Sequence, residues 1–414
     1  MRVLWFTNTM AFSLCPEDVR TSGGWMHAML GALRGRQDLE IGVVTAMPVT
    51  TGEHRCVDGI DAFVVPQPSR YGSWGLRRSL EACARIVQEW NPDLIHIYGT
   101  ERFYGLLTAR RLVARPAVIS LQGLLGPYSE WRHFFGPAGW LEVARMHRLV
   151  EPLMHLGVGW GLLECRKSAR QEGDIIRGNR HFLSYTTWDR SHVAALNPAA
   201  IFHDVADAVR APFWRYRWSL DDCRRFRVVF TNSGHPRKGT EVLLEAGMIL
   251  KDEFPDLQLC IGGTISEASG YGRYLRRRMR ALGKHVVELG ALNAEQVAQE
   301  LTRAHVFVSP SFIENSPNAV CEAQLVGVPA VSSYTGGVPS LIEHGKTGLF
   351  FPNGDAPVLA ARLRQLFLND KLATSLSAQG RALAECRNAT DKVVGQLVSA
   401  YESVAAEGAA GSKN

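Results

Sequence analysis

The stretch Phe312-Ile-Glu-Asn-Ser-Pro-Asn-Ala-Val-Cys-Glu-Ala-Gln-Leu-Val-Gly-Val-Pro329 holds the signal that decides the fold of this chain. It predicts the start of a helix, with Ser316 as the N-cap and Pro317 as the first helical residue, where a missing N–H costs nothing. Glu314 then lies in the loop before the helix, and Glu322 lies on its second turn. The unpaired N–H groups of a helix N-terminus can hold a phosphate, and carboxylates accept hydrogen bonds from hydroxyls. An activated sugar carries this combination of a sugar, a diphosphate and a ribose.

The segments around this stretch indicate an α/β chain. We expect strands at residues 3–6, 41–45, 60–65, 92–98, 117–121, 181–187, 227–231, 257–261, 286–289, 305–309, 330–333 and 348–351. Helical patterns lie between them, at residues 80–90, 101–113, 239–251, 274–282, 294–303 and 358–368. Strands separated by helices imply parallel sheets with right-handed crossovers, in which ligands bind beyond the carboxyl ends of the strands.

The strand pattern starts again after Arg210-Ala-Pro-Phe-Trp-Arg215, so we place a domain boundary there. The chain has 414 residues, which is too long for one ordinary core. We therefore predict two doubly wound, Rossmann-like domains at residues 1–210 and 211–390, facing each other across a cleft.

Composition excludes several classes of protein. Hydrophobic residues make up 46% and charged residues 21%, which is typical of a globular chain. The net charge of +6 suits anionic substrates or an anionic membrane surface but does not indicate nucleic acid. The eight cysteines form no Cys-x-x-Cys pair, so neither a structural zinc site nor a disulfide framework is expected. We therefore expect the chain to reside in the reducing cytosol. The N-terminus predicts a buried strand and not a signal peptide, and no apolar run is long enough to span a bilayer.

Two cations follow the first strand of the second domain. Lys238 and Arg237 lie in a loop that leads into a helix, at the edge of the sheet where a ligand is expected. A diphosphate leaving group needs positive charge there, since no metal-binding motif is present. The alternative is a pair of solvated side chains at a helix start.

The Glu-x7-Glu pattern of Glu314 and Glu322 resembles the signature of retaining glycosyltransferases of family four, which have the GT-B fold. The resemblance continues through Gly327-Val-Pro-Ala-Val-Ser-Ser-Tyr-Thr-Gly-Gly-Val-Pro339 and is looser in the N-terminal half. It implies that the first domain binds the acceptor and the second the donor. It also implies that a helix at residues 391–407 packs back onto the first domain.

The resemblance assigns roles to individual residues. Glu314 would contact the transferred sugar, Glu322 the ribose, and Lys238 with Arg237 the diphosphate, so that Glu314, Lys238 and Arg237 are the catalytic candidates. Donor contacts are also expected from Asn315, Ser316, Pro317, Gly336, Gly337, Ser233, Gly23 and Gly24. Ser233 departs from the family, which usually has a basic residue at this position. Acceptor contacts are expected from Gln122, where relatives often have a histidine, and from His96 and Tyr98, although His96 could equally be a buried core histidine.

These features predict a retaining glycosyltransferase of hexosyltransferase type. It would use a nucleotide-diphosphate sugar as co-substrate, with no cofactor and no metal, and a glycan, lipid-linked or small-molecule acceptor. The family suggests a cytoplasmic bacterial enzyme of polysaccharide biosynthesis that could contact the inner face of the membrane through residues 147–163, although these residues could equally pack in an ordinary way. The basic stretch at residues 271–280 could meet a membrane or a nucleic acid, and the alternative is a solvated amphipathic helix. Two alternatives stay open: a nucleotide-sugar epimerase on the same scaffold, and a catalytically silent sugar-binding protein.

Overall fold

The computed structural model describes residues 1–9, 24–57, 59–68, 73–147 and 157–411. The chain divides into two compact units. Unit 1 comprises Met1–Gly126, Lys167–Ala208 and Thr390–Asn414, and unit 2 comprises Pro127–Arg166 and Val209–Ala389. Residues 127–166, which the sequence analysis placed in the first domain, thus cluster with unit 2.

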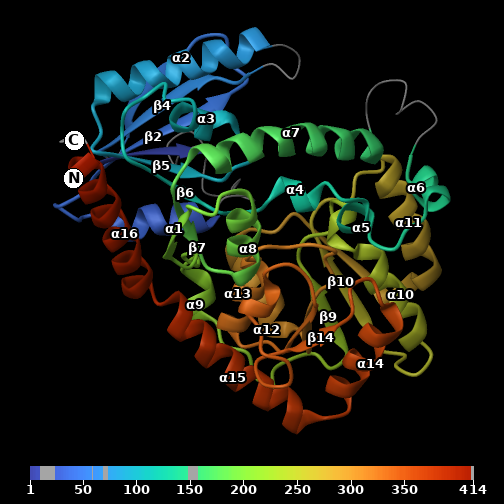
Figure 1. Cartoon of the computed structure of the whole chain (residues 1–414). Coiled ribbons are helices and arrows are strands. Elements are labelled where there is room, and N and C mark those ends of the chain that lie inside the picture. Colours follow the sequence, from blue (N-terminus) through green and yellow to red (C-terminus); the bar gives the residue numbers. More distant parts are fainter. Residues whose placement is uncertain (10–23, 58, 69–72, 148–156, 412–414) are drawn as a thin grey trace. The chain divides into compact units, whose positions relative to one another are not determined.

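Unit 1 is built on an eight-stranded sheet (Figure 1) with the order β3-β4-β2-β1-β5-β6-β7-β8. All neighbouring pairs are parallel except β3 and β4. The strands are β1 (Arg2–Thr7), β2 (Glu40–Met47), β3 (Glu53–Val57), β4 (Ile60–Pro66), β5 (Leu94–Tyr98), β6 (Ala117–Ser120), β7 (His181–Ser184) and β8 (Ile201–Asp204). The helices are α1 (Gly24–Leu33), α2 (Ser73–Trp90), η3 (Phe103–Gly105), α3 (Leu106–Ala109), most of α7 (Val158–Gly178), α8 (Thr187–Leu196) and α16 (Thr390–Gly411).

Both faces of this sheet are covered, which is why its central strands are apolar at nearly every position. Val3 and Trp5 of β1 face one core, where α1 and α16 pack. Leu4 and Phe6 face the opposite core, which α2, η3 and α3 cover (Figure 1). The two-residue alternation of a strand therefore sorts each side chain to one layer. The C-terminal helix α16 belongs to unit 1 because residues such as Leu397 and Tyr401 fill the first of these cores.

Unit 2 contains a six-stranded parallel sheet with the order β11-β10-β9-β12-β13-β14. Its strands are β9 (Arg227–Phe230), β10 (Gln258–Gly262), β11 (Val286–Gly290), β12 (Val306–Ser309), β13 (Ala330–Ser333) and β14 (Leu349–Phe351). Its helices are α4 (Leu125–Tyr128), which begins at the end of unit 1, α5 (Trp131–Phe135), α6 (Trp140–Arg145), α9 (Pro212–Arg215), η4 (Pro236–Lys238), α10 (Thr240–Leu250), α11 (Gly270–Leu282), η5 (Gly283–His285), α12 (Ala294–Arg303), α13 (Asn318–Val326), η6 (Val338–Ser340), α14 (Ala356–Phe367) and α15 (Asp370–Asn388).

The predicted fold class is confirmed, but one predicted helix ends earlier than expected and some elements were not predicted. The helix predicted at residues 101–113 ends at Ala109, because Arg111 adopts a positive φ of 54° and the N–H groups of Leu112 and Val113 turn back to the carbonyl of Leu107. The edge strand β3 was missed because its residues Glu53–Val57 are mostly polar and exposed. The 21-residue helix α7 was also missed.

Candidate active site

A polar cavity opens in unit 2 at the carboxyl ends of the neighbouring strands β9 and β12. It has a volume of about 230 Å³. The N-terminus of α13 forms one wall. The polar residues that line it include Thr231, Asn232, Lys238, Glu314, Ser316 and Asn318. The cavity thus lies at the edge of the sheet where a doubly wound fold binds its ligand.

The start of α13 differs from the prediction by one residue. Pro317 is the N-cap, not the first helical residue, because its ψ of 113° is extended. Its carbonyl accepts the N–H of Val320 at 2.9 Å, and Ser316 supplies no capping bond. Asn318, the first helical residue, has a buried Oδ1 without a hydrogen-bond partner. This wall of the cavity is therefore formed by the first turn of α13, where N–H groups have no partner within the helix.

Lys238 and Glu314 form an ion pair inside the cavity. The distance from Lys238 Nζ to Glu314 Oε1 is 2.5 Å, and the side chains are 17% and 13% exposed. Burial disfavours the ionised form of Glu314, but the charge and hydrogen bond of Lys238, with smaller help from Arg237 and Ser311, hold the pKa of this carboxyl below its ordinary value. Glu314 is therefore a carboxylate and Lys238 its cation at neutral pH.

The backbone around Lys238 explains how it reaches the cavity. The imidazole of His235 accepts the N–H of Arg237 at 3.1 Å and so caps η4. Gly239 then turns the chain into α10 with a φ of 63°. A Cβ atom at Gly239 would lie 2.2 Å from the carbonyl oxygen of Pro310, so only glycine fits there. This close approach holds the η4 turn beside the loop after β12, which carries Glu314.

Arg237 does not line the cavity in the structure. Its guanidinium lies over the ring of Tyr128, 4.5 Å from the centroid, as a cation–π contact. Its carbonyl accepts the N–H of Phe312 at 2.8 Å. The assignment of Arg237 to the diphosphate therefore stays a prediction, and Lys238 is the cation that the structure places in the cavity.

Glu322 forms an ion pair with Arg210, a partner that was not predicted from the sequence. It is 7% exposed, and its Oε1 accepts hydrogen bonds from Arg210 Nε at 3.1 Å and Nη2 at 2.5 Å. Burial raises the pKa of Glu322 above its ordinary value even though Arg210 opposes that shift. Glu322 is not among the residues that line the cavity. Glu322 is therefore a buried carboxylate and not a surface one, and its contact with the ribose stays a prediction.

The Gly336-Gly337 loop supports Glu314 from behind. The N–H of Gly337 donates to the carbonyl of Glu314 at 3.0 Å. A Cβ atom at Gly336, whose φ is 50°, would lie 1.8 Å from that carbonyl oxygen. Two further donor candidates are buried: Asn315, and Ser233, whose hydroxyl donates to the carbonyl of Gly262 at 2.8 Å. Ser233 therefore ties the loop after β9 to the end of β10.

The acceptor candidates lie in unit 1. His96 is buried, and its Nδ1 and Nε2 lie 2.6 Å from the hydroxyl of Tyr401 and 2.7 Å from that of Ser120. Burial lowers its pKa to about 3. Tyr98 is also buried, with its ring against Trp5 and Trp25. Both residues pack in the core, which favours the core-histidine alternative for His96.

The other candidates of unit 1 lie closer to the strand ends. Gln122 is half-buried in the loop after β6, and Gly24 begins α1. Gly23 lies outside the described residues.

Sequence reasoning missed a buried polar cluster near Gln122. Glu172 accepts hydrogen bonds from the Thr100 hydroxyl at 2.5 Å and from the N–H of Gly126 at 2.9 Å, so it anchors the loop that carries Gln122. Burial, with help from Glu172, raises the pKa of Glu101 to about 7, and the amide of Asn8 donates to Glu101 at 3.2 Å. Asn8 follows β1, and Thr100 and Glu101 follow β5, a position that could have identified them. Glu172 lies within α7 and carries no such signal.

Neither a candidate metal site nor a candidate membrane-spanning helix is found in the described part of the chain. Among those residues, no group of three or more His, Cys, Asp or Glu side chains could hold a metal ion. Within the same ranges, no helix combines the length and the apolar character needed to cross a bilayer.

Known glycosyltransferases resemble this chain in sequence. Residues 217–383 match the family model described as "Glycosyl transferases group 1". The chain is 26% identical over 301 residues to the GDP-mannose-dependent alpha-(1-6)-phosphatidylinositol monomannoside mannosyltransferase of Mycolicibacterium smegmatis, covering 65% of this chain and 76% of that protein. It is 33% identical over 174 residues to the phosphatidyl-myo-inositol mannosyltransferase of Mycobacterium leprae, covering 42% of this chain and 45% of that protein.

Solved structures show the same fold along almost the whole chain. Sucrose-phosphate synthase from Thermosynechococcus elongatus superposes with a TM-score of 0.74 and 15% identity, covering 98% of this chain and 99% of that one. Anabaena HepE in complex with UDP and glucose gives a TM-score of 0.68 and 16% identity, covering 97% and 99%. Residues 217–383 therefore belong to the glycosyl transferases group 1 family, and the chain as a whole has the GT-B fold.

Proposed function

We propose that this protein is a retaining glycosyltransferase of hexosyltransferase type that moves a sugar from a nucleotide-diphosphate donor to a glycan, lipid-linked or small-molecule acceptor. The observation that carries the proposal is the Lys238–Glu314 pair in a polar cavity at the N-terminus of α13. This cavity brings together a cation, a carboxylate and free helix N–H groups, which are the groups that a sugar diphosphate needs.

Binding of the donor would exchange the partners of this pair. The diphosphate would take the ammonium of Lys238 and the first N–H groups of α13, because both favour an anion. Glu314 would then be free to accept hydrogen bonds from the hydroxyls of the transferred sugar. Before the donor binds, Lys238 lowers the pKa of Glu314 against the effect of burial, so Glu314 is ionised at neutral pH; in the bound state hydrogen bonds from the sugar hydroxyls would take over that stabilisation.

The reaction would break the bond between the anomeric carbon and the phosphate oxygen and form a bond from that carbon to an acceptor hydroxyl oxygen on the same face. The leaving phosphate oxygen would take the acceptor proton. Lys238 would stabilise the charge that develops on the diphosphate, and Glu314 would hold the sugar in position. We propose that the protein cations fill this role without a metal or other cofactor.

The named relatives suggest the classes of substrate. The M. smegmatis relative is named as dependent on GDP-mannose, and HepE was solved with UDP and with UDP-glucose. Both mannosyltransferases are named for acceptors that contain phosphatidylinositol. We propose a guanosine or uridine diphosphate sugar as donor and a lipid-linked or glycan acceptor, in bacterial glycolipid or polysaccharide assembly on the cytoplasmic side of the membrane.

Calorimetric titration with UDP, GDP, UDP-glucose and GDP-mannose tests the donor site. We expect one nucleotide to bind, and Lys238→Met to weaken it roughly ten- to a hundredfold, because a hydrogen bond between charged groups contributes about 1.5–3 kcal/mol. Lys251→Met is the matched control, since Lys251 pairs with Asp252 away from the cavity. Nuclear magnetic resonance of the product would then give its anomeric configuration. Equal affinity in both variants would refute the site, and an inverted product would refute the retaining mechanism.

A further inference from the structure

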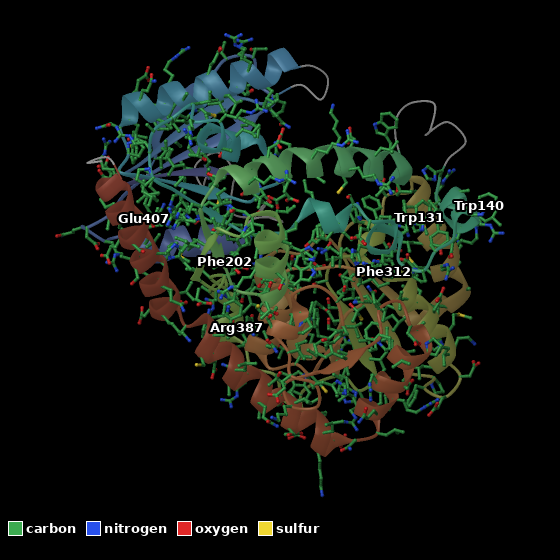
Figure 2. The ribbon with its side chains drawn as sticks, viewed as in Figure 1. Trp131, Trp140, Phe202, Phe312, Arg387 and Glu407 are labelled. Atoms are coloured by element: carbon green, nitrogen blue, oxygen red, sulfur yellow. The ribbon has the colours of Figure 1, made fainter. Side chains whose placement is uncertain are left out.

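Large apolar side chains are exposed on the short helices α5 and α6 and on the first two turns of α7. Trp140 is 72% exposed, Leu141 57%, Leu163 51% and Trp131 40%. Figure 2 labels Trp131 and Trp140, which come from α5 and α6. Exposed tryptophan and leucine at this density mark a contact surface, because single exposed residues are common but neighbouring ones are not.

Hydrogen bonds and packing hold these helices together. Trp131 Nε1 donates to the carbonyl of Ala138 at 2.9 Å, which ties α5 to the segment that leads into α6. The N–H of Gly159, at the start of α7, donates to His147 Nε2 at 3.0 Å. The exposed residues therefore sit on a scaffold with fixed internal contacts.

A row of arginines lies on the neighbouring helix α11. The hydroxyl of Tyr274 donates to Glu142 of α6, and Arg278 Nη2 reaches the same carboxylate at 2.8 Å, so α11 packs against α6 (Figure 1). The spacing of four and three residues puts three exposed arginines on one face of α11. These are Arg273, Arg277 and Arg280, which make no ion pair with another described side chain.

We propose that these seven residues form a docking surface for an anionic lipid bilayer. We call it the Trp–Arg surface, and it consists of Trp131, Trp140, Leu141, Leu163, Arg273, Arg277 and Arg280. Tryptophan is favoured at the boundary between water and lipid, and leucine enters the acyl region beneath it. Each arginine close to an anionic surface adds to the attraction.

Charge decides between a membrane and a second copy of this chain. Glu142, an acidic residue of α6, is turned toward Tyr274 and Arg278 and is neutralised there. Glu130, which precedes Trp131, is paired with Arg132 at 2.9 Å. Among the described residues beside the tryptophans, the exposed charge left without an opposite partner is therefore that of arginine, including Arg145 of α6. Two copies that met through this surface would bring like charges together, whereas an anionic bilayer complements them.

Co-sedimentation with vesicles tests the proposal without any donor or acceptor, so its result does not depend on the proposed glycosyltransferase activity. The full chain would be mixed with vesicles of phosphatidylcholine alone or with phosphatidylglycerol added. We expect binding to the anionic vesicles only, and we expect it to weaken as salt rises. Equal binding to both vesicle types, or none to either, would overturn the proposal.

Two sets of variants separate the apolar and the charged contributions. Arg273→Gln/Arg277→Gln/Arg280→Gln should lower the partition coefficient roughly a hundredfold, the equivalent of about 1 kcal/mol for each basic residue. Its control is Arg85→Gln/Arg110→Gln/Arg111→Gln, which removes the same charge from exposed positions in unit 1. Trp140→Ser/Leu141→Ser should lower binding and reduce fluorescence quenching by brominated lipid, whereas Leu368→Ser, at a side chain that is 68% exposed, should do neither.

The same variants would expose a wrong choice of partner. All replaced side chains are exposed, and circular dichroism would verify that each variant folds. If Trp140→Ser/Leu141→Ser dissociated a dimer and left vesicle binding unchanged, the surface would be a contact between copies of the chain and the proposal would fail. Unchanged vesicle binding in the triple arginine variant would overturn it equally.

Discussion

Replacing Lys238 with methionine leaves the buried carboxylate of Glu314 without its cation. At the observed 2.5 Å the attraction between two unit charges is about 1.7 kcal/mol in bulk water and about 7 kcal/mol at an effective dielectric constant near 20. Desolvation of the two groups offsets much of this gain, but removing one partner of a buried pair typically costs about 3–5 kcal/mol. Because Glu314 is 13% exposed and keeps its hydrogen bond from Ser311, we expect a loss near the lower end, about 3 kcal/mol.

Urea unfolding followed by circular dichroism measures this loss, and its dependence on pH tests the cause. In the wild type the pKa of Glu314 is lowered, so the stability from the pair is present at neutral pH and is lost as the pH falls through that pKa. Without Lys238, burial raises the pKa of Glu314, so the variant gains stability as acidification protonates the carboxyl. The difference between the two proteins should therefore shrink from pH 7 toward pH 4.

Lys251→Met is the control for the loss of a lysine. Lys251 pairs with Asp252, whose side chain is 86% exposed, so we expect less than about 1 kcal/mol. Adding Glu314→Gln to Lys238→Met should recover part of the loss, because it removes the unpaired charge. Equal effects of Lys238→Met and Lys251→Met, or a difference that grows on acidification, would refute the reasoning.

Three further predictions follow from the structure. Gly336→Ala should weaken donor binding and lower the stability of the protein more than Gly345→Ala does. Both glycines have a positive φ, but only at Gly336 would the added methyl group collide with another atom, the carbonyl oxygen of Glu314. Equal losses of stability in thermal unfolding would contradict this. His96→Gln should reduce the loss of stability that occurs as the pH falls from about 6.5 to about 3. In this range His96 binds a proton in the unfolded state but not in the folded one, which lowers the free energy of unfolding by up to about 1.4 kcal/mol per pH unit. Denaturant titrations of both proteins would refute this if stability depended on pH with the same slope in each. Chelation with EDTA should leave the transferase rate unchanged, and an absolute need for Mg²⁺ or Mn²⁺ would contradict the proposed role of Lys238.

Much of the fold was predictable because many of its elements carry a local pattern. The apolar runs at the central strands of both sheets marked parallel strands, and several of the longer helices showed their periodicity, although α7, α8 and α15 were not predicted. Elements without such a pattern were missed, as with the polar edge strand β3. The start of α13 was off by one residue because a proline suits either the N-cap or the first helical position, and only the ψ of Pro317 distinguishes them.

The candidate site was predictable in part. Glu314 and Lys238 follow two strands, and the structure makes those strands neighbours in one sheet, so their side chains meet. Glu322 could be recognised as special, but its partner Arg210 is 112 residues away in the sequence and carries no motif. His96 ended an apolar strand, which allowed either a ligand contact or a core position, and the hydroxyl of Tyr401, 305 residues away, shows it packed in the core.

The sequence by itself determined the kinds of element, their order and the carboxylates and cations that stand at strand ends, because caps and hydrophobic periodicity act over a few residues. Only the tertiary structure decided the partners: Lys238 for Glu314, Arg210 for Glu322, and α11 for α6. The physical reason is that a buried charge must find an opposite charge wherever the fold brings one near, and such distances do not depend on separation along the chain.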